Sequence, residues 1–458
     1  MRGVDYVIQA AYLAASVLFI LGLKSLTKPD SARRGMQQAA VGMLLAIVGT
    51  LLHHEIVRYD WIAGGLIIGT IVGIPLGVMV PMTAMPQRIA ISHMFGALAA
   101  TLVGIVEYGH GVPDRAKMAA LGFEVLFGAL TITGSLMAFA KLQELVSGRP
   151  ITYRGQNAVN LATFAVALLL FGYLIYNPGA TGAFYLMTVL GLVIGVSMVL
   201  PIGGADMPVV ISLLNSYAGL ASSATGFAIG NNVLIIAGAL DGASGFLLSI
   251  LMSKAMNRSF GNILFGAFGS PVEATKKTAA GLEVRPITAE DAAMRLGYAR
   301  SVIVVPGYGL AVAQAQHQVR EMADLIERKG GEVKYAIHPV AGRMPGHMNV
   351  LLAEADVPYD RLYDMDAINE EFARADVALV IGANDVVNPA ARNDPSSPIH
   401  GMPILDVDKA KSIIVMKRSM NPGFAGIENE LFYNEKTSML FGDAKASLTR
   451  LIGEIKNL

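Results

Sequence analysis

The segment Ser-Val-Ile-Val-Val-Pro-Gly-Tyr-Gly-Leu-Ala-Val-Ala-Gln occupies residues 301–314. Its run of β-branched residues up to Val305 is typical of a strand buried on both faces in a parallel sheet. A turn with two glycines follows at once, and the pattern from Leu310 to about residue 329 is that of one long helix. A strand, a glycine turn and a helix in this order predict the first unit of a doubly wound sheet.

Strand and helix patterns continue to alternate as far as the C-terminus. Further strands are expected at 333–338 and near 361–365, 376–381, 411–416 and 438–441, with helices between them and a last helix near 443–456. The alternation predicts a soluble, Rossmann-like α/β domain with a doubly wound parallel sheet at 300–458. The polar residues 261–299 are expected to form a linker.

The turn at Gly307 and Gly309 suits the pyrophosphate of a dinucleotide. Glycine lets the backbone approach the phosphates, and the N-terminus of the following helix offers N–H donors. Ala313 stands roughly where a third, close-packing glycine is often found. The motif alone is a weak signal, because tight turns between a strand and a helix also occur without a ligand.

Two strand ends favour NADP over NAD. NAD-binding domains usually carry an acid at the end of the second strand, where it binds the ribose 2′-OH. Here that strand ends at His338, with Arg343 nearby, and Lys417-Arg418-Ser419 follows the strand at 411–416. Lysine, arginine and serine can together bind a 2′-phosphate, although an exposed basic pair without a ligand would have the same spacing.

Two further segments are candidates for ligand contact. Val380 to Asp385 ends a strand in a turn of small residues, with Gly382, Asn384 and Asp385 at the sheet edge where ligands bind in such folds. The glycine-rich stretch from Gly423 to Gly426 could fold over a bound cofactor or could be an ordinary surface loop.

The N-terminal part of the chain has a different composition. The whole sequence is 53% hydrophobic and 15% charged, and residues 1–260 are mostly apolar. About 20 apolar residues in a helix cross a bilayer. Nine membrane spans are predicted, at about 4–23, 36–52, 61–80, 88–108, 118–140, 157–176, 181–200, 206–228 and 232–252.

The distribution of basic residues predicts the orientation of these spans. The loops after spans one, three, five and seven, and the segment after span nine, hold most of the lysines and arginines, so this side is expected to be cytoplasmic, together with the C-terminal domain. The 35 basic and 35 acidic residues balance, which gives no electrostatic support for a nucleic-acid partner. The chain has no cysteine, which excludes disulfides and thiolate metal sites, and no metal site is predicted.

Polar residues inside a span are costly, so each is a functional hypothesis. His93 is the best candidate for a proton carrier, because imidazole titrates near neutral pH. Asn215 cannot titrate, but with Ser216 it could hold a water molecule or orient an imidazole. The alternative for each is a structural hydrogen bond between helices.

Three acids also fall within or beside the predicted spans. Asp206 begins span eight, where an acid at a helix N-terminus more often caps the helix than relays protons. Glu124 in span five and Asp241 in span nine could be neutral or could face water.

Several longer strings resemble one family, the beta subunits of proton-translocating NAD(P)⁺ transhydrogenases. In the soluble part they are Pro306 to Gln316, Ile337 to Glu354, Val380 to Ala390 and Lys417 to Asn421; in the apolar part they are Gly203 to Pro208, Leu214 to Tyr217 and Lys254 to Ser259. The resemblance covers essentially the whole chain, with the strings in the family's order. Asp241 is the position that departs from the family pattern.

The resemblance implies a function for each part. The family transfers hydride from NADH to NADP⁺, driven by inward proton flow, with NAD(H) held by a separate alpha subunit or subunits. It implies that residues 1–260 translocate protons in the lipid bilayer of a bacterial inner membrane, and that the alpha–beta unit forms a homodimer. A membrane transporter or channel with a cytoplasmic nucleotide-sensing domain is the alternative class.

The resemblance also assigns residues by position. It places Gly307, Tyr308, Gly309 and Val312 at the pyrophosphate turn, Arg343 and Asp385 beside the cofactor, Lys417, Arg418 and Ser419 at the 2′-phosphate, and the Gly423 to Gly426 stretch as a lid. His93 and Asn215 match proton-pathway residues, and Asp206 matches a coupling residue. No catalytic side chain is expected, because hydride passes directly between the cofactors.

Overall fold

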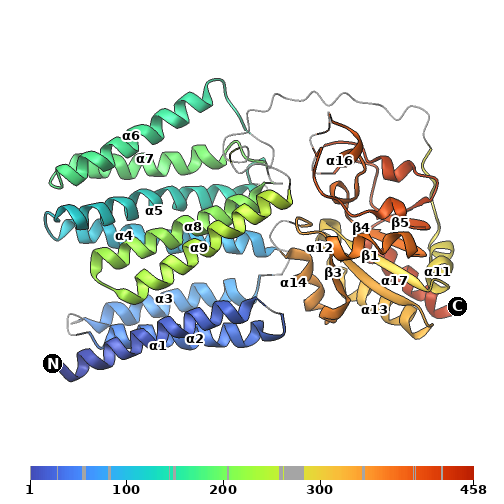
Figure 1. The fold of residues 1–458 in the computed structure, drawn as a ribbon, viewed down its shortest axis with the longest axis horizontal. Coiled ribbons are helices and arrows are strands. Elements are labelled where there is room, and N and C mark those ends of the chain that lie inside the picture. Colours follow the sequence, from blue (N-terminus) through green and yellow to red (C-terminus); the bar gives the residue numbers. More distant parts are fainter. Residues whose placement is uncertain are drawn as a thin grey trace. The chain divides into compact units, whose positions relative to one another are not determined.

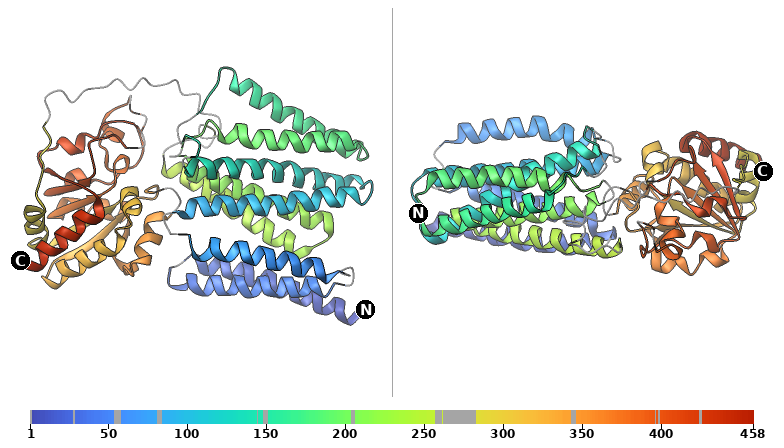
Figure 2. Two further views of the ribbon diagram at one scale, coloured as in Figure 1. Left: turned by 180° about the vertical axis from the view of Figure 1, so that it is seen from behind. Right: turned by 90° about the horizontal axis from the view of Figure 1, so that it is seen from above.

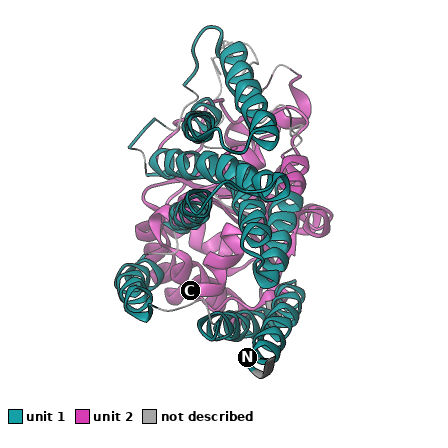
Figure 3. Ribbon diagram, turned by 90° about the vertical axis from the view of Figure 1, so that its left-hand side faces the viewer, with its two compact units in different colours: residues 1–203, 209–249 teal, residues 204–208, 250–458 magenta. Residues whose placement is uncertain are grey.

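The computed structural model of the protein describes most of the chain. The described residues are 2–27, 29–53, 58–80, 84–143, 145–147, 151–203, 206–256, 261, 283–342, 346–395, 397, 399–423 and 426–458. They fall into two compact units, which Figure 3 colours separately. The first comprises residues 1–203 and 209–249, and the second comprises 204–208 and 250–458.

The first unit is a bundle of long helices, labelled in Figure 1. In the described residues these are α1 (Arg2–Leu26), α2 (Pro29–Leu51), α3 (Tyr59–Val78), α4 (Met85–Gly109), α5 (Arg115–Leu142), α6 (Gln156–Tyr176), α7 (Thr181–Val199), α8 (Met207–Ile229) and α9 (Asn232–Ala255). They match the nine predicted spans. Eight are long and apolar enough to cross a membrane, and α2 falls short because Arg34, Gln37 and Gln38 lie in its first half.

Helices α5 and α8 form the centre of this bundle. In their most apolar stretches 61% and 78% of the residues are buried, whereas α3 buries none. Small residues allow the close packing. A side-chain carbon added at Gly195 of α7 would lie 2.1 Å from the Leu130 carbonyl oxygen of α5, and one at Gly219 of α8 would lie 2.4 Å from the Gly242 nitrogen of α9.

The second unit contains a six-stranded parallel sheet. Its strands are β1 (Ser301–Pro306), β2 (Glu332–Ile337), β3 (Leu362–Asp364), β4 (Val377–Ile381), β5 (Ser412–Lys417) and β6 (Thr437–Phe441). The order across the sheet is β3-β2-β1-β4-β5-β6, and all neighbours are parallel. The predicted Rossmann-like fold is therefore confirmed.

Side chains alternate between the two faces of the sheet. Val302 and Val304 point to a core formed with α11 (Ala289–Gly297), α12 (Tyr308–Ala313), α13 (Gln316–Arg328), α14 (His347–Glu354) and α17 (Ala444–Asn457). Ile303 and Val305 point to a second core formed with shorter segments, which include α15 (Met365–Asn369) and four 3-10 turns. Long helices such as α13 and α17 thus cover one face only (Figure 1 and Figure 2).

The predicted single helix from Leu310 to about residue 329 was wrong. Gln314 has a left-handed backbone (φ 49°) and ends α12, and its N–H bonds to the carbonyls of Leu310 and Ala311. A second helix, α13, starts at Gln316. The apolar spacing of the segment matches one helix, but glutamine carries no sequence signal for this backbone conformation, which glycine or asparagine more often adopts.

Candidate functional site

The carboxyl ends of β1 and β4 lie side by side in the middle of the sheet. The chain leaves these strands in opposite directions, to β2 and to β5, so this is the switch point at which ligands bind in doubly wound folds. The turns after the two strands are joined by backbone hydrogen bonds. Gly307 donates to the Ile381 carbonyl (2.9 Å) and Gly309 donates to the Gly382 carbonyl (3.0 Å).

The glycines of both turns are required by this contact. A side-chain carbon at Gly307 would lie 2.4 Å from backbone atoms of Ala383, and one at Gly309 would lie 2.6 Å from the Gly382 Cα. Gly382 has φ +65°, which L-residues rarely adopt. The structure therefore gives the glycines of the motif a packing role within the protein, beyond the phosphate contact predicted for them.

The other two residues predicted at this turn belong to the short helix α12. Tyr308 is half-buried, and its ring lies 6.2 Å from the ring of His347. Val312 is 47% exposed. Because α12 ends at Ala313, the turn leads into a helix of 6 residues and not into the long helix predicted.

The segment after β5 packs directly on the turn after β4. A side-chain carbon at Gly423 would lie 2.1 Å from the Asn384 amide nitrogen and 2.7 Å from an Asp385 carboxylate oxygen. The structure thus brings together two segments that were predicted separately, the turn with Asn384 and Asp385 and the stretch that starts at Gly423. Gly426 is exposed with φ +73°, and Arg343 lies outside the described residues.

Two buried asparagines hold these segments together, and neither was predicted from the sequence. Asn429 donates to the Asn384 carbonyl (2.9 Å), and its own side-chain oxygen accepts from Leu431. Asn388 donates to the Glu428 carbonyl (3.0 Å). Both are at most 2% exposed. No spacing marks them, since their partners are backbone groups of segments about 40 residues away.

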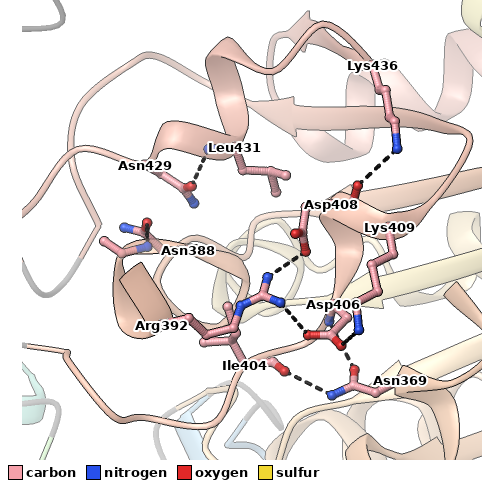
Figure 4. Close-up of polar contacts among 11 residues, drawn as sticks. Asn369, Asn388, Arg392, Ile404, Asp406, Asp408, Lys409, Asn429, Leu431 and Lys436 are labelled. Carbon is pink, nitrogen blue, oxygen red and sulfur yellow. Dashed lines mark hydrogen bonds and ion pairs between the residues drawn. The ribbon is translucent and has the colours of Figure 1, made fainter. Parts of the chain in front are cut away.

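A network of charged groups fixes the chain between α16 (Ala390–Asn393) and β5 (Figure 4). The Arg392 guanidinium contacts the carboxylates of Asp406 (3.1 Å) and Asp408 (2.6 Å). Lys409 also pairs with Asp406 (2.6 Å), whose backbone N–H bonds to the Asn369 side chain (3.0 Å). The long connection between β4 and β5 is therefore anchored by side-chain contacts shortly before it enters β5.

Lys417 is turned toward the segment that follows it. Its ammonium donates to the Asn421 carbonyl (2.6 Å) and lies 4.7 Å from the centre of the Phe432 ring. Burial lowers the pKa of Lys417, and the charge of Asp385 opposes that shift. Arg418 and Ser419 are exposed, and the Ser419 hydroxyl accepts from the Asn421 N–H (3.4 Å).

His338 stands where an NAD-binding domain would carry an acid. It is 2% exposed, its Nε2 lies 2.8 Å from the Pro403 carbonyl, and its Nδ1 accepts from the Val340 N–H (3.2 Å). The Nε2–H tautomer satisfies both contacts. The ring is part of the protein core at this strand end and is not available to a ribose.

Acidification should destabilise the second unit through His338. Burial lowers its pKa to about 4, against the weaker effect of the Pro403 carbonyl. The neutral ring therefore stabilises the fold above pH 6.5, and that stability is lost as pH falls toward 4. Between pH 7.5 and pH 5 the loss is about 2 kcal/mol.

The measurement compares wild type with His338→Gln, by denaturant-dependent hydrogen exchange of amides in β1 and β4. The variant should lose about 2 kcal/mol less than wild type over this pH interval. His317→Gln, on the exposed side of α13, is the matched control. An equal pH dependence in His338→Gln and wild type would show that the imidazole does not carry the effect.

In the first unit, the predicted polar residues lie on α4 and α8. His93 of α4 is half-buried, and its Nδ1 has no hydrogen-bond partner among the described residues. Asn215 of α8 donates to an Asp241 carboxylate oxygen of α9 (3.1 Å). Ser216 is buried and donates to the Gly242 carbonyl (2.7 Å), which supports the structural alternative for this residue.

Two charged residues of α5 are more buried than the sequence indicates. Glu124 is fully buried, and neither carboxylate oxygen has a hydrogen-bond partner within the described part of the chain. Lys141 directly follows the predicted fifth span, in a loop of the side that is expected to be cytoplasmic. It is 2% exposed, and its ammonium donates to the carbonyls of Val199, Leu200 and Ile202 at the end of α7. Asp206, which directly precedes α8, is 9% exposed.

Comparison with known proteins identifies the family. The model of the family "NAD(P) transhydrogenase beta subunit" matches residues 8–454. A relative named "NAD(P) transhydrogenase subunit beta", from Rhodospirillum rubrum, is 49% identical over 454 residues, which are 97% of this chain and 98% of the relative. A second Rhodospirillum rubrum sequence of the same name matches equally well. With its apolar helices and parallel-sheet domain, the chain belongs to the NAD(P) transhydrogenase beta-subunit family.

Proposed function

We propose that the second unit binds NADP(H) and that the first conducts protons, so that proton flow drives hydride transfer from NADH to NADP⁺. The observation that carries the cofactor assignment is the contrast between two strand ends. β2 ends in His338, which bonds to Pro403, whereas β5 ends in Lys417-Arg418-Ser419. A dinucleotide with a 2′-phosphate fits the second end, and the first lacks the acid that would favour NAD.

The chain's own residues would position the cofactor. The cofactor would lie on the joined turns at Gly307 and Gly382, at the switch point of the sheet. Asp385 would lie beside it, and Gly423, which packs on Asn384 and Asp385, would approach it from the side of β5. The bound nicotinamide supplies the hydride chemistry. The protein's task is to hold two nicotinamides close together, which requires no nucleophilic side chain.

The partner and the membrane follow from the family. A beta subunit implies an alpha subunit, to which we assign the NAD(H) site. We further propose a homodimer of the alpha–beta unit, in a bacterial inner membrane with the C-terminal domain in the cytoplasm. The excess of lysine and arginine on the predicted cytoplasmic side supports this orientation.

The test is reconstitution of the full chain in lipid vesicles, alone and with the alpha subunit. Alone, the chain should bind NADP(H) in preference to NAD(H). With the alpha subunit it should form NADPH from NADH, faster when the side opposite the nucleotide domain is made acidic. Nucleotide-dependent ion flux without any NADPH formation would instead establish the channel class.

His93→Ala should separate the coupling to the pH gradient from the binding of NADP(H). Imidazole is the side chain best suited to exchange protons near neutral pH, so its removal should abolish the acceleration by the pH gradient and leave NADP(H) binding within about twofold of wild type. Ser92→Ala, at the exposed neighbouring position, is the control. Normal coupling in His93→Ala would remove His93 from the proposed pathway.

A further inference from the structure

Asp241 is one of two acids whose roles the sequence left open, and its carboxylate has a defined partner in the bundle. It lies on α9, nine residues after Asn232 and fourteen before Ala255, or about 14 Å and 21 Å from the ends of the helix at about 1.5 Å per residue. It is therefore at membrane depth. Its carboxylate oxygen accepts from the Asn215 amide of α8 (3.1 Å), and the side chain is otherwise exposed on the surface of this chain.

Helices α8 and α9, which carry Asn215 and Asp241, pack closely backbone against backbone. A side-chain carbon at Gly238 of α9 would lie 2.5 Å from the Ser223 nitrogen of α8, so the two backbones touch. On the other side of the acid, Ser212 donates to the Gly245 carbonyl (2.9 Å). Fixed contacts on both sides of Asp241 hold its carboxylate at the amide.

The packing of α4 on α5 gives the depth of His93. Gly128 of α5 faces Ala97 and Thr101 of α4, which lie four and eight residues after His93. The helices are antiparallel, since Gly104 faces the earlier residues Glu124 and Val125. His93 is therefore level with residues 132–136 of α5.

The packing of α5 on α8 places Asn215 at the same level. Gly134 of α5 faces Leu214, the residue before Asn215. Ser135, next along α5, is fully buried, and its hydroxyl has no partner among the described residues. One layer of the bundle thus contains an imidazole nitrogen and a hydroxyl with open hydrogen-bonding capacity, and an amide bonded to a carboxylate.

An amide cannot carry a proton, so Asn215 can act in this layer only by orienting groups that do. The group that it holds is the Asp241 carboxylate. An acid at the centre of a spanning helix costs about 2.5–3.5 kcal/mol and is retained where function requires it. No other charged side chain of the described residues contacts Asp241; the Ser244 hydroxyl of its own helix bonds to its backbone carbonyl (2.9 Å).

We infer that Asp241 is a second proton-carrying residue of the membrane domain, oriented by Asn215 and working in the same layer as His93. In each cycle the carboxylate takes up one proton to become a neutral acid and then releases that proton to the next group of the pathway, with no other bond changed. This inference rests on the proposed coupling of proton flow to hydride transfer.

The test uses the full chain with the alpha subunit in vesicles. Asp241→Asn keeps the shape and an oxygen for the Asn215 amide but cannot take up a proton. The acceleration of NADPH formation by a pH gradient should fall to less than about a tenth of wild type, with the Kd for NADP(H) within about twofold. Asp241→Glu should restore at least about half of the acceleration, because the position is exposed and the longer acid fits.

Three comparisons keep the inference open to refutation. Ser244→Ala, one turn along α9, should behave as wild type. Asn215→Ala combined with Asp241→Asn should be no worse than the more impaired single variant, because the two act as a unit. Acceleration by the pH gradient equal to that of wild type in Asp241→Asn overturns the inference. If Asp241→Asn is not produced as a folded protein, Asp241→Glu decides instead, and a complete loss of the acceleration in that variant overturns the inference. If wild type itself is indifferent to the gradient, the proposed function is what has failed.

Discussion

Gly307→Ala should abolish NADP(H) binding and strongly destabilise the second unit. The added methyl group would lie 2.4 Å from backbone atoms of both Ala383 and Gly382. These atoms belong to the turn after β4 and cannot rotate away as a side chain can, so the overlap must separate two central strands. The expected cost is at least about 3 kcal/mol, at the upper end for overpacked sites. Nucleotide binding and hydrogen exchange in β1 and β4 would both report it.

The matched control for this substitution is Gly453→Ala. Gly453 is exposed in α17, and a side-chain carbon there would meet nothing within 4 Å. Alanine should stabilise the helix by up to about 1 kcal/mol and leave nucleotide binding unchanged. If Gly307→Ala binds NADP(H) normally, the two turns separate more easily than their contacts indicate.

Arg418→Ala should remove most of the preference for NADP over NAD. Arg418 is exposed at the end of β5, whereas the neighbouring Lys417 already donates to Asn421. The guanidinium is therefore the cation best placed for a 2′-phosphate. Charge-assisted hydrogen bonds contribute about 1.5–3 kcal/mol, so binding of NADP⁺ should weaken by about 10- to 150-fold.

Binding of NAD⁺ to the same variant should change by less than about twofold, since NAD⁺ has no phosphate at this position. Arg450→Ala, which removes an exposed arginine of α17, is the control for a general loss of positive charge. Equal weakening of NAD⁺ and NADP⁺ binding would place Arg418 at the shared part of the cofactor and exclude the phosphate assignment.

The sequence predicted those features that depend on local pattern. In the described residues, nine long helices and six strands lie close to their predicted positions. Apolar runs of the length of a bilayer favour a spanning helix, and short β-branched runs between turns favour a buried strand. The break at Gln314 was missed because glutamine rarely adopts a left-handed backbone and so carries no sequence signal for it. The burial of Lys141 was missed because its partners are carbonyls at the end of another helix.

In the candidate site, too, residues marked by a local pattern were predicted and residues whose contacts are long-range were not. Gly307, Asp385 and Lys417 follow strands and could be placed at one sheet edge from chain order alone. Asn388 and Asn429 could not, since their partners are backbone groups brought near by the return of the chain from β4 to β5. The contact between Asn215 and Asp241 depends on the rotation of two helices about their axes, which apolar composition does not determine.

The two asparagine bonds between the segments after β4 and β5 have an energetic consequence. Each is an amide-to-carbonyl bond, with a net value of about 0.5–1.5 kcal/mol, so the two together contribute about 1–3 kcal/mol to holding the segments together. A change of one to two units in the proton affinity of a distant group supplies about the same free energy. The two bonds together are therefore of a size that one protonation could offset, and the apolar packing of Val387 and Phe432 in the same core adds to the cost of separating the segments.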